Sequence, residues 1–195
     1  MALILPSDPA PRRMNMRMVS ARNELSPAFG GDSLRLNRKG TKYAADIEFP
    51  PMTYDRGNAF TDLDAEADTV VIEVRQPGID TGAPGAANLV KGAGQAGSSL
   101  LIDGVTPGYV FGKGWYLTHI NAGRRRLYRS AATAVANGSG EITIPLRTLL
   151  RYPPADNDVV LLARPQIEGY VSGTDMWNVD ADDRLVRISF TITER

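Results

Sequence analysis

Three features of the sequence predict a mainly β fold. Short runs in which apolar and polar residues alternate recur along the chain, and a period of two is typical of strands that bury one face. The chain's 19 Gly and 13 Pro, among 195 residues, interrupt these runs at short intervals, as closely spaced turns require. Only one segment, residues 53–68, has the apolar spacing of a helix, so the sequence does not predict a helical bundle.

Three strands are expected before this helix. They cover residues 14–19, 34–36 and 43–49, where apolar side chains occupy alternate positions. Residues 26–32, with the sequence Ser-Pro-Ala-Phe-Gly-Gly-Asp, predict a turn. The segment Arg38-Lys39-Gly40 predicts a hairpin turn that joins the second strand to the third.

The helix is expected to begin after Thr53, a suitable N-cap residue. Phe60, Leu63 and Ala67 follow at positions i, i+3 and i+7 with acidic residues between them, so this helix presents one apolar stripe to a core. A strand is expected directly afterwards, over residues 69–74, because β-branched residues dominate that segment.

The second half of the chain predicts an inserted unit. Residues 78–99 are rich in Gly and Ala and predict a loop, and Pro153-Pro154 marks a later boundary. We therefore expect a small all-β unit, residues 85–151, inserted into a β-rich domain formed by residues 1–84 and 152–195. The remaining strands are expected at residues 100–102, 115–120, 126–129, 133–136, 141–144, 159–163 and 184–193.

Composition argues against several classes of function. Lys+Arg and Asp+Glu both number 22, so the chain lacks the basic surplus typical of nucleic-acid binding. It contains no cysteine, which excludes disulfides, thiol catalysis and cysteine-based metal sites. Its apolar stretches are too short for a membrane span or a signal peptide. We expect a soluble protein made in the cytoplasm, with no membrane insertion.

Two motifs resemble ligand sites but favour structural interpretations. Residues 92–97 fit the pattern G-x-G-x-x-G. A dinucleotide site needs a helix directly after this pattern, and Pro107-Gly108 argue against a helix there. We therefore expect a flexible loop that connects domains. A set of acidic residues has the spacing of a calcium loop, but Ala67 stands where that loop needs Gly. We expect a solvated acidic helix face. The set is Asp62, Asp64, Glu66, Asp68 and Glu73.

The charged residues of the inserted unit do not predict a catalytic centre. His119 is the only histidine, and no nucleophile motif accompanies it. We expect a strand histidine that faces solvent or is hydrogen-bonded at a sheet edge. Residues 124–126 are three consecutive arginines and are expected in a solvated hairpin turn, with a contact to a partner subunit as the second choice. The sequence therefore predicts no catalytic, cofactor-binding or metal-binding residues, no cofactor and no enzyme.

Aromatic residues are scattered along the predicted strands and are expected to pack in cores. Some of them could instead form an exposed platform on which a sugar stacks. The sequence does not distinguish the two uses. The residues are Trp115, Tyr116, Tyr128, Tyr152, Tyr170 and Trp177.

Three stretches, in this order, resemble the distal tail (tail-tip or baseplate) proteins of siphophages and gene transfer agents. The first runs from Ser26-Pro27-Ala28-Phe29-Gly30-Gly31 to Phe49-Pro50-Pro51-Met52. The second comprises Gly94-Gln95-Ala96-Gly97 with Leu100–Gly104, and continues through Gly112–Leu117 to Leu127-Tyr128. The third is Gly138–Arg147, which contains a Pro-Leu-Arg turn. The loop of residues 76–92 departs from the family pattern.

This resemblance implies a fold and a function. The fold would be a tail-tube-like β-sandwich with one flanking α-helix and an inserted small β-barrel. The function would be that of a structural virion protein at the tail tip, joining the tail tube to the receptor-binding hub. Its partners would be further copies of itself in a closed ring, expected to be a hexamer, the tail tube protein, hub or fibre proteins, and the tape measure protein.

Two other functions stay open at this point. The chain could be a receptor- or carbohydrate-binding module of the tail tip, with stacking aromatics on the inserted barrel. It could also be a cell-wall hydrolase of the tail, which would need a pair of carboxylates in a cleft because Cys is absent and His is single.

The first residues of the chain form an unusual segment. Residues 2–13 contain three prolines, which remove backbone donors and prevent a central strand. They also contain Leu3, Ile4 and Leu5, which are costly to leave in water. We expect the segment to lie on a neighbouring subunit or on the tail tube and to become ordered only in the assembly. The alternative is that it packs against its own core or frays.

Overall fold

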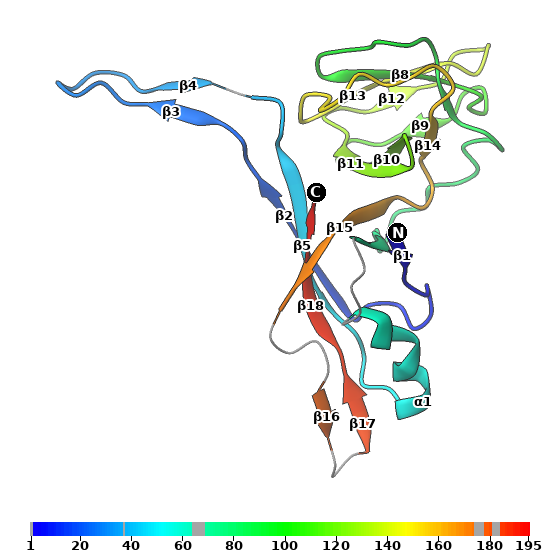
Figure 1. Cartoon of the computed structure of the whole chain (residues 1–195). Coiled ribbons are helices and arrows are strands. Elements are labelled where there is room, and N and C mark those ends of the chain that lie inside the picture. Colours follow the sequence, from blue (N-terminus) through cyan, green and yellow to red (C-terminus); the bar gives the residue numbers. More distant parts are fainter. Residues whose placement is uncertain (1, 37, 64–68, 174–177, 181–183) are drawn as a thin grey trace.

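The computed structural model describes residues 2–36, 38–63, 69–173, 178–180 and 184–195. It is mainly β with one short helix, as predicted, and its strands form several sheets (Figure 1). Two six-stranded sheets make up most of the structure. Each has its own cluster of buried apolar side chains.

The first sheet combines strands from both ends of the chain, in the order β1-β6-β15-β18-β5-β2. All its neighbours are antiparallel except β1 and β6. Alternation places one face of each strand in a common core, which contains Ala45, Ile47, Ile72, Ile167 and Ile192. The strands are β1 (Ala2–Ile4), β2 (Arg13–Val19), β5 (Lys42–Glu48), β6 (Thr69–Glu73), β15 (Gln166–Ser172) and β18 (Ser189–Glu194).

The predicted helix is present but short. Helix α1 (Tyr54–Gly57) continues as a 3-10 helix, η1 (Asn58–Leu63), and Phe60 and Leu63 pack into the first core as expected. Thr53 has the extended backbone of an N-cap, but its side chain makes no capping hydrogen bond. The rest of the predicted helix, residues 64–68, lies outside the described residues.

The second sheet is formed by residues from the middle of the chain, in the order β11-β10-β14-β7-β8-β13. A bridge between Ser130 and Leu146 connects the two outer strands just beyond their ends. The strands are β7 (Leu89–Val90), β8 (Ser99–Asp103), β10 (Tyr116–Asn121), β11 (Arg124–Arg129), β13 (Ile142–Pro145) and β14 (Val159–Leu161); β9 (Val110–Phe111) and β12 (Ala134–Val135) form a separate pair.

The two cores divide the chain into an outer and an inner part. Apart from Leu127, the first core uses residues up to Val74 and resumes at Ile167, while the second uses residues from Val90 to Leu162. Strand β14 belongs to the second sheet, although it follows residue 151, where the inserted unit was expected to end.

A long hairpin projects from the first sheet (Figure 1). Strand β3 (Asn23–Leu25) pairs with β4 (Leu34–Leu36) in a two-stranded sheet, and the predicted turn at residues 26–32 joins them. The prediction of a hairpin turn at Arg38-Lys39-Gly40 was wrong, because β5 pairs with β2 and not with β4. We call residues 20–41, which extend beyond the sheet, the arm.

Two further strand predictions need correction. The single strand expected over residues 184–193 is divided into β17 (Leu185–Arg187), which pairs with β16 (Asn178–Asp180), and β18, which enters the first sheet. Strand β15 lies in the interior of that sheet and was not predicted. Its Gly169 and Glu168 are residue types with low strand propensity, so no strand was predicted there. They form a strand because tertiary structure supplies their partners.

The N-terminal segment lies on its own domain. Strand β1 pairs in parallel with β6, Leu5 is buried, and Leu3 packs against the first core. The chain therefore adopts the second of the two arrangements considered above. The prolines do not prevent this, because β1 precedes them and occupies the sheet edge.

Candidate functional site

Two buried glutamates hold the two sheets together. Strand β11 is an outer strand of the second sheet, so every second N–H group on it points away from β10 and needs another partner. Glu168 of β15 and Glu194 of β18 provide these partners from the first sheet. We call Glu168, Glu194 and the groups that they bind the carboxylate clamp.

Glu194 has the larger set of contacts. One carboxylate oxygen, Oε2, accepts from the Tyr43 N–H at 2.8 Å; the other, Oε1, accepts from the Leu127 N–H at 2.7 Å and from Arg151 Nη2 at 2.5 Å. Only 1% of the Glu194 side chain and 5% of the Arg151 side chain are exposed. Burial acts to lower the pKa of the Arg151 guanidinium, but the Glu194 carboxylate outweighs this and the pKa is raised.

Glu168 completes the clamp two residues along β11. Its Oε2 atom accepts from the Arg125 N–H at 2.9 Å, and its Oε1 atom accepts from the Thr69 hydroxyl at 3.2 Å. Arg125 Nε also donates to the Gln166 side chain at 2.7 Å. The Thr118 hydroxyl donates to the Gln166 carbonyl oxygen and accepts from the Gln166 N–H.

Apolar contacts reinforce this junction. Leu127 of β11 packs in the first core, whereas its neighbour Tyr128 packs in the second. Tyr116 likewise packs against the first core and meets Tyr43 edge to face at 5.7 Å between ring centroids. Because charged, polar and apolar contacts all cross the junction, we expect the two sheets to move as one body. Nothing in the sequence around Glu168 or Glu194 indicates this use.

The prediction of a solvated hairpin turn at residues 124–126 was wrong, whereas a contact of this run with a partner subunit stays a prediction. The turn between β10 and β11 is formed by Ala122 and Gly123, both with positive φ, as a two-residue hairpin loop requires. Residues 124–126 therefore belong to β11. Arg125 binds the clamp, and Arg126 is largely buried with its guanidinium 4.1 Å from the centroid of the Tyr152 ring.

His119 is neither exposed nor at a sheet edge, contrary to prediction. It is fully buried on β10, between β11 and β14, and its Nε2 atom lies 2.8 Å from Asp158 Oδ2. Burial lowers the pKa of His119, although the hydrogen bond to Asp158 acts in the opposite direction. Asp158 also accepts from Asn121 and from the Ala155 N–H. The other ring nitrogen, Nδ1, has no hydrogen-bond partner among the described residues. No Ser or Thr hydroxyl of the described residues is therefore hydrogen-bonded to His119, as a catalytic nucleophile would be.

The G-x-G-x-x-G segment is a loop, as predicted, but it joins β7 to β8 within one sheet and does not connect domains. The Gln95 side chain accepts from the Leu101 N–H at 2.8 Å and donates to the Lys91 carbonyl oxygen at 2.9 Å. The Gly92 N–H donates to Asp156. The loop is thus held by hydrogen bonds to the strand ends beside it and to the segment around Asp156.

The calcium-like spacing is mostly untested. Asp64, Glu66 and Asp68 lie outside the described residues, as does the side chain of Asp62. Glu73 ends β6 and lies 3.5 Å from Arg75. Within the described ranges, no three His, Asp or Glu side chains are grouped as a metal site requires.

The aromatic residues serve mainly as core. Tyr128 is fully buried, Trp115 packs edge to face on Phe111, and Trp177 lies outside the described residues. Tyr152 and Tyr170 are more than half exposed. The Arg126 guanidinium already lies against the Tyr152 ring.

The arm exposes apolar side chains to an unusual extent. Every described residue from Arg22 to Lys39 is exposed. Apolar side chains on and beside the arm include Phe29, which is completely exposed at the tip, and Met18, Val19, Leu25, Leu34 and Leu36. A set of this size on one projection is typical of a surface that binds another protein.

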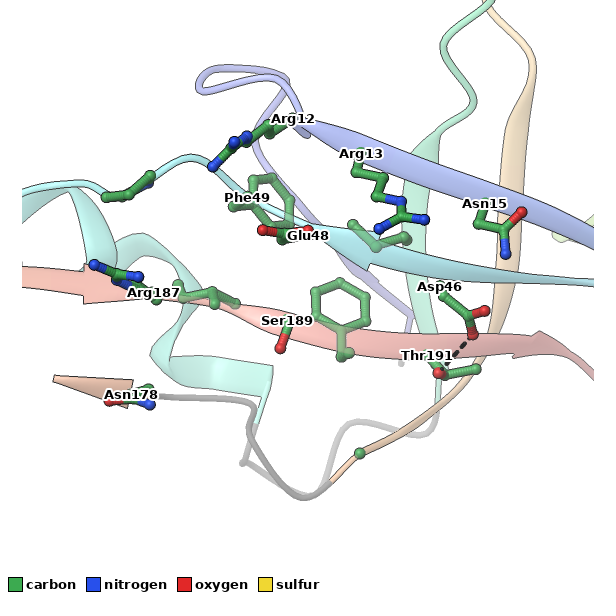
Figure 2. A pocket seen from close by; sticks show the side chains of 15 residues that line it. Arg12, Arg13, Asn15, Asp46, Glu48, Phe49, Asn178, Arg187, Ser189 and Thr191 are labelled. Carbon is green, nitrogen blue, oxygen red and sulfur yellow. Dashed lines mark hydrogen bonds between the residues drawn. The ribbon is translucent and has the colours of Figure 1, made fainter. Parts of the chain in front are cut away.

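Figure 2 shows a groove of about 630 Å³ lined by β2, β5 and β18. It lies at the Arg13–Glu48 end of the β2–β5 pair, and the arm leaves from the Val19–Lys42 end. Strand register forms two polar rows across β2, β5 and β18 on its floor. Asp46 in the second row accepts from the Thr191 hydroxyl and pairs with Arg17. Arg12 and Arg187 lie at its border. The rows are Arg13–Glu48–Ser189 and Asn15–Asp46–Thr191.

No protein-family model matches the chain, and no curated protein matches it either. Among the described residues, no helix has the length and apolar character needed to cross a membrane.

Proposed function

We propose that this protein is a structural virion protein, a ring-forming distal tail subunit that joins the tail tube to the receptor-binding hub. The observation that carries the proposal is the projecting arm. An arm with exposed apolar side chains, on a body whose two sheets are clamped together, suits a subunit that is built into an assembly. The order of the family-like motifs in the sequence supports the particular position at the tail tip.

The proposal includes the finer architecture. We propose that the first sheet and the strands and helix packed on it form a tube-like β-sandwich, and that the second sheet forms a small inserted β-barrel. The Ser130–Leu146 bridge supports the barrel, together with hydrogen bonds from the Ala131 N–H to the Pro145 carbonyl oxygen and from the Arg147 N–H to the Arg129 carbonyl oxygen. These contacts join β11 and β13, the two outer strands of the sheet.

Labelled particles test the function. The protein would be tagged at its C-terminus in the virus or gene transfer agent that encodes it, and purified particles would be imaged by electron microscopy. We expect a ring of several copies between the tube and the hub. A tag found only on heads or fibres, or a single copy at the tip, would contradict the proposal.

A further inference from the structure

A second cleft lies where the base of the arm stands beside the second sheet (Figure 1). Its volume of about 440 Å³ is within the range of about 300–1,000 Å³ that is usual for pockets that take a small ligand. One wall is formed by the end of β2 and by both sides of the arm. The other wall is formed by the residue before β8 and by residues 146–149, which follow β13. We call this pocket the basic cleft.

The charged residues of the basic cleft are all positive. Among the described residues that line it, three are arginines and none is acidic. Arg22 and Arg38 come from the two sides of the arm, and Arg147 follows β13. In the part of the chain that the structure describes, none of the three has an ion-pair partner. The whole chain has a net charge of zero, so this surplus is local, and a local surplus in a cleft attracts anions.

The basic cleft also contains a buried hydroxyl without a partner. Thr148 is only 7% exposed, and its Oγ1 atom forms no hydrogen bond with any described residue. Its backbone is held in place, because the N–H groups of Leu146 and Leu150 donate to the carbonyl oxygens of Ser98 and Gly97 at 2.7 and 2.8 Å. A buried polar group without a partner is unfavourable. A ligand that accepts from this hydroxyl would remove that cost.

Two further hydroxyls in the basic cleft have a hydrogen to donate. Ser20 Oγ accepts from the backbone N–H and from Nε of Arg22, at 3.4 and 2.8 Å. Thr41 Oγ1 accepts from the Ala21 N–H at 3.3 Å. A hydroxyl oxygen that already accepts keeps its own hydrogen for another partner. The cleft therefore presents guanidinium and hydroxyl donors, and the group that suits it is an oxyanion, which only accepts.

We infer that the basic cleft binds a phosphate group, either as free phosphate or as an ester on a larger molecule. Phosphate presents oxygens in several directions, which suits guanidinium groups from three separate segments, and arginine forks bind phosphate oxygens in pairs. A carboxylate presents only two oxygens. Because Arg22 and Arg38 belong to the arm and Thr148 follows a strand of the second sheet, the bound group would tie the arm to that sheet. The inference does not depend on the proposed function, so either can fail alone.

Isothermal titration calorimetry of the whole chain with inorganic phosphate tests the site, at an ionic strength held at about 0.1 M with sodium chloride. Arg147→Met should weaken binding about tenfold to hundredfold, because it removes a charge-assisted contact. Arg147 is exposed, so the variant should fold, and an unchanged melting temperature would show that it does.

Arg124→Met is the matched control. Arg124 is also exposed and does not line the basic cleft. The Arg147 N–H bonds the carbonyl oxygen of Arg129 at one end of β11, and Arg124 begins that strand, about 16 Å away. This distance exceeds the screening length of about 10 Å at this ionic strength. The control should therefore change the affinity by less than about threefold.

Thr148→Val separates ligand binding from folding. Valine has nearly the shape of threonine but no hydroxyl, and no hydrogen bond within the protein is lost. The melting temperature without phosphate should therefore stay the same or rise, while phosphate binding should weaken about twofold to tenfold. A large fall in the melting temperature of the ligand-free variant would show that the hydroxyl is used within the protein, and would overturn its place in the site.

Two further titrants identify the class and source of the ligand. Binding of inorganic phosphate but not dimethyl phosphate would support the inference with free phosphate as the ligand, and binding of both would support it with a phosphodiester of a larger molecule. Equal affinity for a tetraglutamate peptide would overturn the choice of phosphate. The inference would also be wrong if phosphate showed no saturable binding, or if Arg147→Met and Arg124→Met weakened it equally.

Discussion

The Glu194→Gln variant tests whether the carboxylate clamp holds the two sheets together. Glutamine has nearly the shape of glutamate but provides only one acceptor oxygen. Glu194 accepts from the Tyr43 N–H through one oxygen, and from the Leu127 N–H and Arg151 through the other. In either orientation the new amide group therefore directs N–H atoms at a donor, and Arg151 loses its counter-charge.

The expected loss follows from burial. Leaving a buried N–H without an acceptor costs about 1–3 kcal/mol, and breaking a buried ion pair by removing one partner costs about 3–5 kcal/mol. These effects overlap, so we expect the free energy of unfolding to fall by about 3–5 kcal/mol. For a chain of this size, about 2–4 °C is lost per kcal/mol, so the melting temperature should fall by roughly 6–20 °C.

Urea and thermal unfolding followed by circular dichroism would measure this loss. The control is Glu24→Gln on the arm, which removes an exposed pair with Arg35 at 3.5 Å and should cost less than about 1 kcal/mol. Adding Arg151→Met to Glu194→Gln should recover part of the stability, because the unpaired buried charge is gone. A loss below about 1 kcal/mol, or one equal to that of the control, would refute the role assigned to Glu194.

Three further predictions follow from the fold. Burial lowers the pKa of His119 below the unfolded value of about 6.5, so the free energy of unfolding should fall as the pH drops through about 6.5. His119→Gln should reduce this pH dependence of the melting temperature, measured between about pH 5.5 and 7.5. Deleting residues 2–5 removes β1 and the buried Leu5 and should cost roughly 2–5 kcal/mol in urea unfolding; an unchanged midpoint would show that this segment does not stabilise its own domain. Gln95→Ala leaves the Leu101 N–H without its acceptor and should cost about 1–3 kcal/mol in urea unfolding. Gln95→Glu should also destabilise the protein, because it keeps the acceptor but turns an oxygen toward the Lys91 carbonyl oxygen that the Gln95 amide donates to.

Much of the fold could be predicted from local patterns. Residues 43–49 were expected to form a strand because apolar side chains alternate there, and β5 covers Lys42–Glu48. The helix after Thr53 was located by its cap and its apolar spacing, although its second part is a 3-10 helix. These signals are readable because the period of a strand or helix is a local property of the chain.

Partners far apart in the chain could not be predicted. Glu194 binds Tyr43 and Leu127, which are 151 and 67 residues away, and no local pattern indicates which donors an acidic residue will meet. His119 occupies an alternating run that is compatible with either face of a sheet, and only the pairing of β10 between β11 and β14 buries it beside Asp158.

The sequence by itself determined the mainly β class, the positions of most strands and the turn at the arm tip, because alternation, Gly and Pro act through neighbouring residues. Tertiary structure decided that β5 pairs with β2 and not with β4, the strand that precedes it in the chain. Because of this pairing, residues 20–41 extend from the body as an arm. It also decided that two acidic side chains of one sheet satisfy the outward N–H groups of the other. Both outcomes depend on which strand edges meet, and that is set by the burial of the whole chain and not by any one segment.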